Sequence, residues 1–125
     1  MLKFSAAIAS SVTFLPDAGV RGTVVIGVTA GFIEYPIASP RTFVSFATNI
    51  DVVVPDGGGV DIQLFHNGNP VADFITGYNP GETGVKTVIA PAPEFFDVAD
   101  TFYVRVFTFN FAPNFYLATA TIGLA

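Results

Sequence analysis

Glycine and proline interrupt this chain every few residues. The sequence holds 12 glycines and nine prolines among 125 residues, and the segments between them are rich in β-branched and aromatic side chains. No window of about 11 residues combines the i, i+3, i+4, i+7 apolar spacing of a helix with residues that favour helices. The chain is therefore predicted to be all-β, with short strands joined by turns.

The segments between the turns predict about eight strands. They are residues 2–14, 22–30, 41–54, 59–65, 70–76, 85–90, 101–111 and 115–125, and 91–100 is predicted to be a loop with two prolines. Residues 2–14 are compatible with a short helix, although an edge strand is favoured. Strands that recur every 8–12 residues are typical of an antiparallel β-sandwich or barrel. One domain is expected to fill residues 1–125, which suits a chain of this length.

Residues 59–76 predict a β-hairpin. Its tip is expected to comprise His66, Asn67, Gly68 and Asn69, because Asn-Gly adopts the left-handed backbone angles of a tight hairpin turn. Gly68 should then have a positive φ. His66, beside the turn, is expected to be exposed to solvent.

The charge content is low for a soluble domain. The chain is 51% hydrophobic and 12% charged, whereas soluble domains are about 25% charged. No apolar run reaches the ~18 residues of a membrane-spanning helix. Serines interrupt the apolar character of residues 1–16, so no cleaved signal peptide is expected. The excess apolar side chains are instead expected to meet another protein chain. A net charge of −5 argues against nucleic acid, whose binding depends on neutralising phosphates.

The strand predicted at 101–111 has two faces that are both largely apolar. One face carries Phe102, Val104, Val106, Thr108 and Asn110, and suits a sandwich core. The other carries Tyr103, Arg105, Phe107, Phe109 and Phe111, residue types that are enriched at subunit interfaces. This second face is predicted to be an oligomer interface, with Asp97 or Asp100 of a neighbouring subunit facing Arg105. The alternative is that both faces lie inside one sandwich, or that a loop covers the second.

The strand predicted at 41–54 shows a clearer alternation. Its even-numbered residues are expected to face the core; they are Thr42, Val44, Phe46, Thr48, Ile50 and Val52.

The chemistry of the chain does not suggest an enzyme. His66 is the only histidine, and no serine follows Ser45, so no nucleophile–base set is specified. We predict no catalytic residue, no cofactor and no metal ligand set. The acidic segment with Glu94, Asp97 and Asp100 offers at most one weak cation site; its simpler interpretation is a solvated turn.

Three segments resemble small jelly-roll domains of tailed-bacteriophage virions. They are "GVDIQLFHNGNPVADF" (59–74), "FDVADTFYVRVF" (96–107) and "FYLATATIGLA" (115–125), within a similarity that covers roughly residues 40–125. Asp97, Asp100, Phe102, Val104 and Val106 fall in matching positions. Ala99 departs from the pattern, which usually has glycine there, and residues 107–115 do not map onto it. The resemblance implies a jelly roll of the tumour-necrosis-factor and complement type, usually trimeric.

The function that this resemblance implies is structural. We expect a capsid decoration or cement protein that binds the phage head surface as a homotrimer and stabilises the shell. Its partners would be itself and the major capsid protein or another virion protein, on the capsid exterior, after synthesis in the host cytoplasm. A fibre needs a shaft, for which 125 residues leave no room. The alternative is a fibre-tip or lectin-like module that recognises a host surface, with Tyr35 and Tyr78 as stacking residues in loops.

Overall fold

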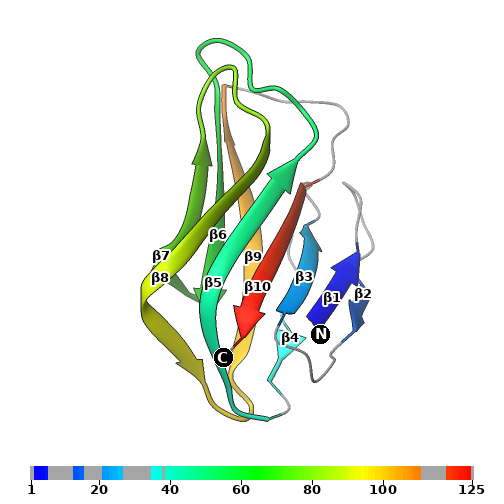
Figure 1. The fold of residues 1–125 in the computed structure, drawn as a ribbon, viewed down its shortest axis with the longest axis vertical. Coiled ribbons are helices and arrows are strands. Elements are labelled where there is room, and N and C mark those ends of the chain that lie inside the picture. Colours follow the sequence, from blue (N-terminus) through cyan, green and yellow to red (C-terminus); the bar gives the residue numbers. More distant parts are fainter. Residues whose placement is uncertain are drawn as a thin grey trace.

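The computed structural model describes residues 2–5, 13–15, 21–26, 35–37, 39–110 and 118–124. These residues form ten strands (Figure 1): β1 (Leu2–Ser5), β2 (Thr13–Leu15), β3 (Arg21–Ile26), β4 (Tyr35–Pro36), β5 (Arg41–Ile50), β6 (Gly59–His66), β7 (Asn69–Tyr78), β8 (Gly84–Phe96), β9 (Thr101–Phe109) and β10 (Ala118–Leu124). Within the described ranges, no helix is long and apolar enough to cross a membrane.

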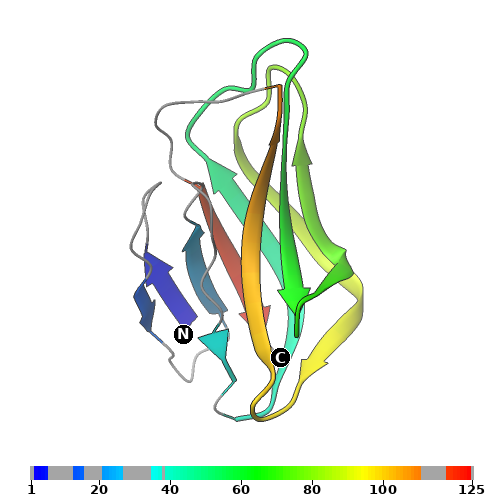
Figure 2. The same ribbon diagram turned by 180° about the vertical axis from the view of Figure 1, so that it is seen from behind.

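The strands build two sheets that face each other as a sandwich (Figures 1 and 2). One sheet has the order β2-β1-β3-β10-β5-β8, and the other has the order β4-β9-β6-β7. Neighbours are antiparallel except for β1 and β3, which run parallel. The prediction of an all-β sandwich is confirmed. The described residues form ten strands because residues 2–14 contribute two short segments and Tyr35–Pro36 adds another.

The hydrophobic core comes from the six long strands β5 to β10, three in each sheet. Side chains of a strand alternate between its faces, and on β6 the inward set Val60, Ile62 and Leu64 is completely buried. On β9 the inward set includes Phe102 and Val104. Phe102 and Val104 of the predicted core face therefore do belong to the core, with Val106 packed at its margin, whereas Asn110 is exposed.

The predicted core face of β5 is only half right. The pairing of β5 with β8 shifts between Phe43 and Ser45: Phe43 lies opposite Glu94, whereas Ser45 lies opposite Ile89. A bulge of this kind changes which side chains face inward. Phe43 is completely buried, as are Phe46 and Ile50, whereas Val44 is half-buried.

The prediction that residues 91–100 form a loop is wrong up to Phe96, because β8 continues to that residue. Pro91 and Pro93 lie in the stretch of β8 that the register shift leaves without partners on β5. Proline cannot donate a hydrogen bond to a sheet ladder, and this is the position within a strand that tolerates it. Pairing then resumes and places Phe96, fully buried, opposite Arg41.

A chain of buried hydroxyl groups connects the two sheets. Thr48 Oγ1 on β5 lies 2.7 Å from Thr76 Oγ1 and 2.9 Å from the Tyr78 hydroxyl, both on β7. The Tyr78 hydroxyl donates to the Gly84 carbonyl at 2.8 Å, and burial raises the pKa of the Tyr78 phenol. Tyr78 is 1% exposed, so the prediction that it lies in a loop and stacks on a sugar is wrong. The side chain of Tyr35 lies outside the described residues.

Candidate functional site

The β6–β7 hairpin ends in a two-residue turn. β6 ends at His66 and β7 begins at Asn69, and these two residues face each other in the ladder. Asn67 and Gly68 have φ angles of 49° and 83°, the left-handed values that Asn-Gly adopts most readily in a tight hairpin. The turn therefore projects the side chains of His66 and Asn67 from one end of the sandwich.

The loop between β8 and β9 reaches the same end of the molecule. Its backbone turns where the Asp100 N–H donates to the Asp97 carbonyl at 3.1 Å, and Ala99 within it has a φ of 71°. The Asp97 N–H donates in return to Asp100 Oδ2 at 2.9 Å. The Asp100 carboxylate is thereby directed toward the hairpin.

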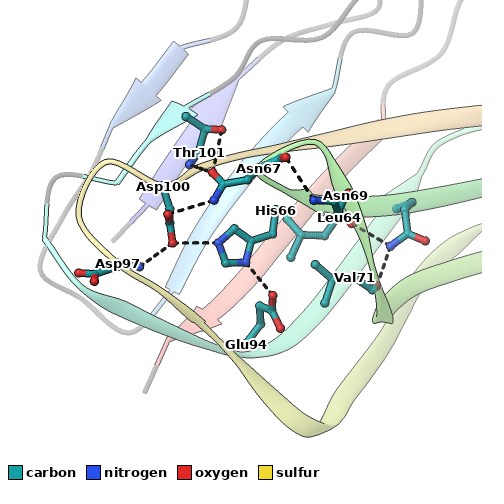
Figure 3. A network of polar contacts seen from close by, with 10 residues as sticks. Leu64, His66, Asn67, Asn69, Val71, Glu94, Asp97, Asp100 and Thr101 are labelled. Carbon is teal, nitrogen blue, oxygen red and sulfur yellow. Dashed lines mark hydrogen bonds and ion pairs between the residues drawn. The ribbon is translucent and has the colours of Figure 1, made fainter.

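His66 lies between two carboxylates (Figure 3). Its Nδ1 is 2.7 Å from Glu94 Oε2, and its Nε2 is 2.9 Å from Asp100 Oδ2. The imidazole stacks on the buried Phe96 ring with centroids 3.8 Å apart. The His66 side chain is only 17% exposed, so the prediction of a solvent-exposed histidine is wrong: the neighbouring loop covers it.

Asn67 makes the second set of contacts between the hairpin and the loop. Its Nδ2 donates to Asp100 Oδ1 at 3.0 Å, and its Oδ1 accepts from the Thr101 N–H at 2.8 Å. The backbone N–H of Asn67 donates to the Thr101 carbonyl at 2.9 Å. We call the set of residues that makes these contacts the tip cluster; it comprises His66, Asn67, Glu94, Asp97, Asp100 and Thr101.

The tip cluster is suited to holding segments together. Both ring nitrogens of His66 already face carboxylate oxygens, and an imidazole makes both contacts as a donor only when both nitrogens carry a proton. A general base needs a free ring nitrogen directed at its substrate. The cluster instead joins the β6–β7 hairpin of one sheet to β8 of the other.

The pKa of Asp100 gives this connection a pH dependence. The Asn67 amide, the Asp97 N–H and the His66 ring all stabilise the ionised carboxylate, and they lower its pKa from 3.8 to about 2. Since the folded state lowers this pKa, the stabilisation is complete above the unfolded-state pKa and is lost as the pH falls through the folded-state value.

We therefore expect the melting temperature to fall between pH 4 and pH 2 more steeply in the wild type than in Asp100→Asn, which has no carboxylate to protonate at this position. Thermal unfolding followed by circular dichroism across that range measures the two slopes. Parallel curves for the two proteins would contradict the role given to Asp100.

The acidic residues considered for a weak cation site are engaged in other contacts. Glu94 and Asp100 contact His66, and Asp97 Oδ1 accepts from the Val98 N–H at 2.7 Å. Among the residues that the structure describes, no group of three or more His, Cys, Asp or Glu side chains could hold a metal ion.

A shallow pocket of about 380 Å³ lies beside the tip cluster, between the start of β7 and β8. Its lining includes His66, Asn69, Pro70, Val71 and Glu94. Amide, carboxylate and small apolar groups thus meet here, a mixture that can orient a small polar ligand.

An aromatic face covers the outer side of the four-stranded sheet. It comprises Phe65 on β6 and Tyr103, Phe107 and Phe109 on β9. Phe65 stacks on Tyr103 with centroids 4.6 Å apart and lies 6.3 Å from the Phe107 ring. Phe109 is 51% exposed.

The residues predicted to form the oligomer interface differ in how far they are exposed in the single chain. Tyr103 is 7% exposed in the single chain, so it is already covered and has little surface left for a partner. The Arg105 guanidinium lies over the Phe107 ring at 5.1 Å. Phe111 lies outside the described residues. The predicted contact between Arg105 and Asp97 or Asp100 of a neighbouring subunit stays a prediction; within its own chain, each Asp100 oxygen already makes one hydrogen bond.

Sequence reasoning did not find the tip cluster. It considered Glu94 and Asp100 only as part of a weak cation site or a solvated turn, and did not connect them with His66, which lies 28 and 34 residues before them in the chain. They meet His66 because the end of β8 and the loop after it lie against the β6–β7 hairpin of the other sheet, and no local sequence pattern encodes this packing.

No protein-family model, curated protein or solved structure matches the chain.

Proposed function

We propose that the sandwich is a jelly roll. The observation that supports it best is a nested set of antiparallel pairs: β6 with β7, β5 with β8, β4 with β9 and β3 with β10. Such nesting is what results when one long hairpin is wound into two facing sheets. Eight strands in two sheets are typical of jelly rolls, which are common in viral capsid proteins and lectins.

The loop between β8 and β9 adds to the resemblance with phage jelly-roll domains. The pattern usually has glycine where this chain has Ala99, and Ala99 adopts a φ of 71°. A positive φ is the conformation for which glycine is favoured, and another residue there bears a strain of about 1–3 kcal/mol. The departure in sequence thus preserves a glycine-type turn.

The function we propose is that of a non-enzymatic virion surface protein, a capsid decoration or cement protein that binds the head as a homotrimer. Three features favour a structural role: a tip cluster that connects the sheets, an exposed Phe109 on the aromatic face, and a charged fraction of only 12%. Obligate interfaces resemble a domain core cut in half, and the aromatic face offers such a surface. The virion location rests on the resemblance.

The copy number of this chain in purified virions tests the proposal. A cement protein is expected at a number comparable to that of the major capsid protein, as quantitative mass spectrometry of the particles would measure. Absence of the chain from the particles would overturn the virion proposal altogether.

The pocket beside the tip cluster favours a second candidate, a fibre-tip or lectin-like module that recognises a host surface. Asn69 and Glu94 in its lining offer the donors and acceptors that neutral polar ligands need. If the chain is a fibre-tip module, a particle would carry only a few trimers of it. The same copy-number measurement therefore separates the two candidates.

A further inference from the structure

The two most exposed large hydrophobic side chains of the described residues lie together on β8. Ile89 is 79% exposed and Val85 is 69% exposed, and Thr87 between them is exposed on the same side. β8 ends the order of its sheet in the described part of the chain; at the left of Figure 1 it borders the sheet in front. No described strand thus pairs with the outer edge of β8, and two of its exposed side chains there, Val85 and Ile89, are apolar.

β7, the neighbouring edge strand of the second sheet, is protected against edge pairing, unlike β8. β7 begins with Asn69-Pro70, and Gln63 Nε2 donates to the Val71 and Phe74 carbonyls where the ladder between β6 and β7 is irregular. Lys86 Nζ donates to the Gly77 carbonyl at 2.7 Å. Proline, bulges and charges are the devices by which proteins prevent edge pairing. On β8 the prolines occur only from residue 91 onward.

On β5 and β10, the described residues in the same rows as the exposed side chains of β8 are uncharged. Across the ladder, Val85, Thr87 and Ile89 lie opposite Asn49, Ala47 and Ser45 of β5. The next strand continues the same rows with Thr119, Thr121 and Gly123. The single charged side chain of residues 84–90 is Lys86, which pairs with Glu82 of its own chain at 2.8 Å. The surface therefore offers nothing to a highly charged partner.

We propose that residues 84–90 of β8 pair antiparallel with the same residues of a second copy of this chain, about a twofold axis at Thr87. In this register Val85 of each copy faces Ile89 of the other, and Thr87 faces itself. A C2 contact of this kind uses one patch twice. It extends the six-stranded sheet across both copies and buries the two most exposed aliphatic side chains.

The charge pattern selects this register from its neighbours. A shift of the register by one residue would move every side chain of one copy to the opposite face of the shared sheet, and is therefore excluded. An axis at residue 86 would place Lys86 opposite its own copy, and like charges directly opposite each other are destabilising. An axis at residue 88 would place Val85 opposite Pro91, which has no N–H to donate.

A single cysteine at the axis provides the first test, since the chain has no other. Directly opposite residues of an antiparallel pair have Cα atoms about 4.5–5.5 Å apart, within the range that a disulfide bridges. The matched control is Asn49→Cys, on the same exposed face but one strand inward, and therefore about 14 Å or more from its mate across three strand spacings. We expect Thr87→Cys to form disulfide-linked dimers at least about tenfold faster than the control on oxidation, because pairing raises the local thiol concentration.

Charge exchange at residue 87 tests the twofold symmetry itself. Thr87→Lys and Thr87→Glu each place like charges opposite each other and should lose the β8 contact when alone. A one-to-one mixture should recover it as a mixed dimer, which native mass spectrometry resolves. Equal cross-linking at residues 87 and 49, or no recovery in the mixture, would overturn the proposal. The proposed trimer contact lies on the other sheet, so its failure would leave these results unchanged.

Discussion

Replacing Phe96 by alanine is expected to destabilise the fold by about 3–5 kcal/mol, the usual cost of removing a fully buried phenylalanine ring. Phe96 is 0% exposed. Its ring centroid lies 4.3 Å from that of Phe43 on β5 and 6.1 Å from that of Phe102 on β9. The ring therefore joins both sheets at the end that carries the tip cluster, and it also supports the stacked His66. Urea unfolding of the purified protein measures the change in free energy.

The adjacent residue is the matched control. Phe95 is on the same strand but faces outward and is 56% exposed, so Phe95→Ala should change stability by no more than about 0.5 kcal/mol. If the two variants lost similar stability, residues 94–96 would not form the inward and outward alternation of β8. That result would indicate that this segment is a loop, as the sequence predicts.

The difference between the sequence-based prediction of this segment and its structure has a physical cause. Two prolines within three residues normally end a strand, and they do interrupt the ladder between β8 and β5. The strand resumes at Glu94 because Phe43 and Phe96 bury each other across the bulge. A bulge on β5 likewise places Phe43, and not the predicted Val44, on the core face. Non-local packing, which local periodicity cannot report, decides both cases.

Local chemistry was sufficient where the turn itself dictates the conformation. Asn67-Gly68 specifies a tight hairpin through its own backbone preferences. The alternation of β9 correctly places Phe102 and Val104 in the core, although Tyr103 on the other face is also buried. The tip cluster was out of reach of such reasoning. His66, Glu94 and Asp100 belong to three different segments, and their meeting depends on the order of strands in two sheets.

Replacing Phe109 by aspartate is expected to separate the proposed trimer into single chains. Phe109 is the most exposed ring of the aromatic face at 51%, so a partner can cover it. An unpaired carboxylate buried in such a seam costs at least about 3 kcal/mol, which is more than a hundredfold in the association constant. Sedimentation velocity of the variant at micromolar concentration would show the loss of the trimer.

Val98→Asp is the control for this substitution. Val98 is 53% exposed, slightly more than Phe109, but lies in the loop before β9, at the opposite end of that strand. The same charge placed there should leave the assembly intact. If Phe109→Asp remains assembled, the seam lies elsewhere. If Val98→Asp dissociates equally, the effect is one of net charge and not of position.

The mass of the wild-type protein in solution tests the central claim most directly. A chain of 13.2 kDa with this surface is expected to scatter light at micromolar concentration as a trimer, or as a larger multiple of three where the β8 edges also pair. A stable monomer of 13.2 kDa would contradict the account of this protein as an assembly subunit. A stable dimer would contradict the trimer and leave the β8 contact as the sole association.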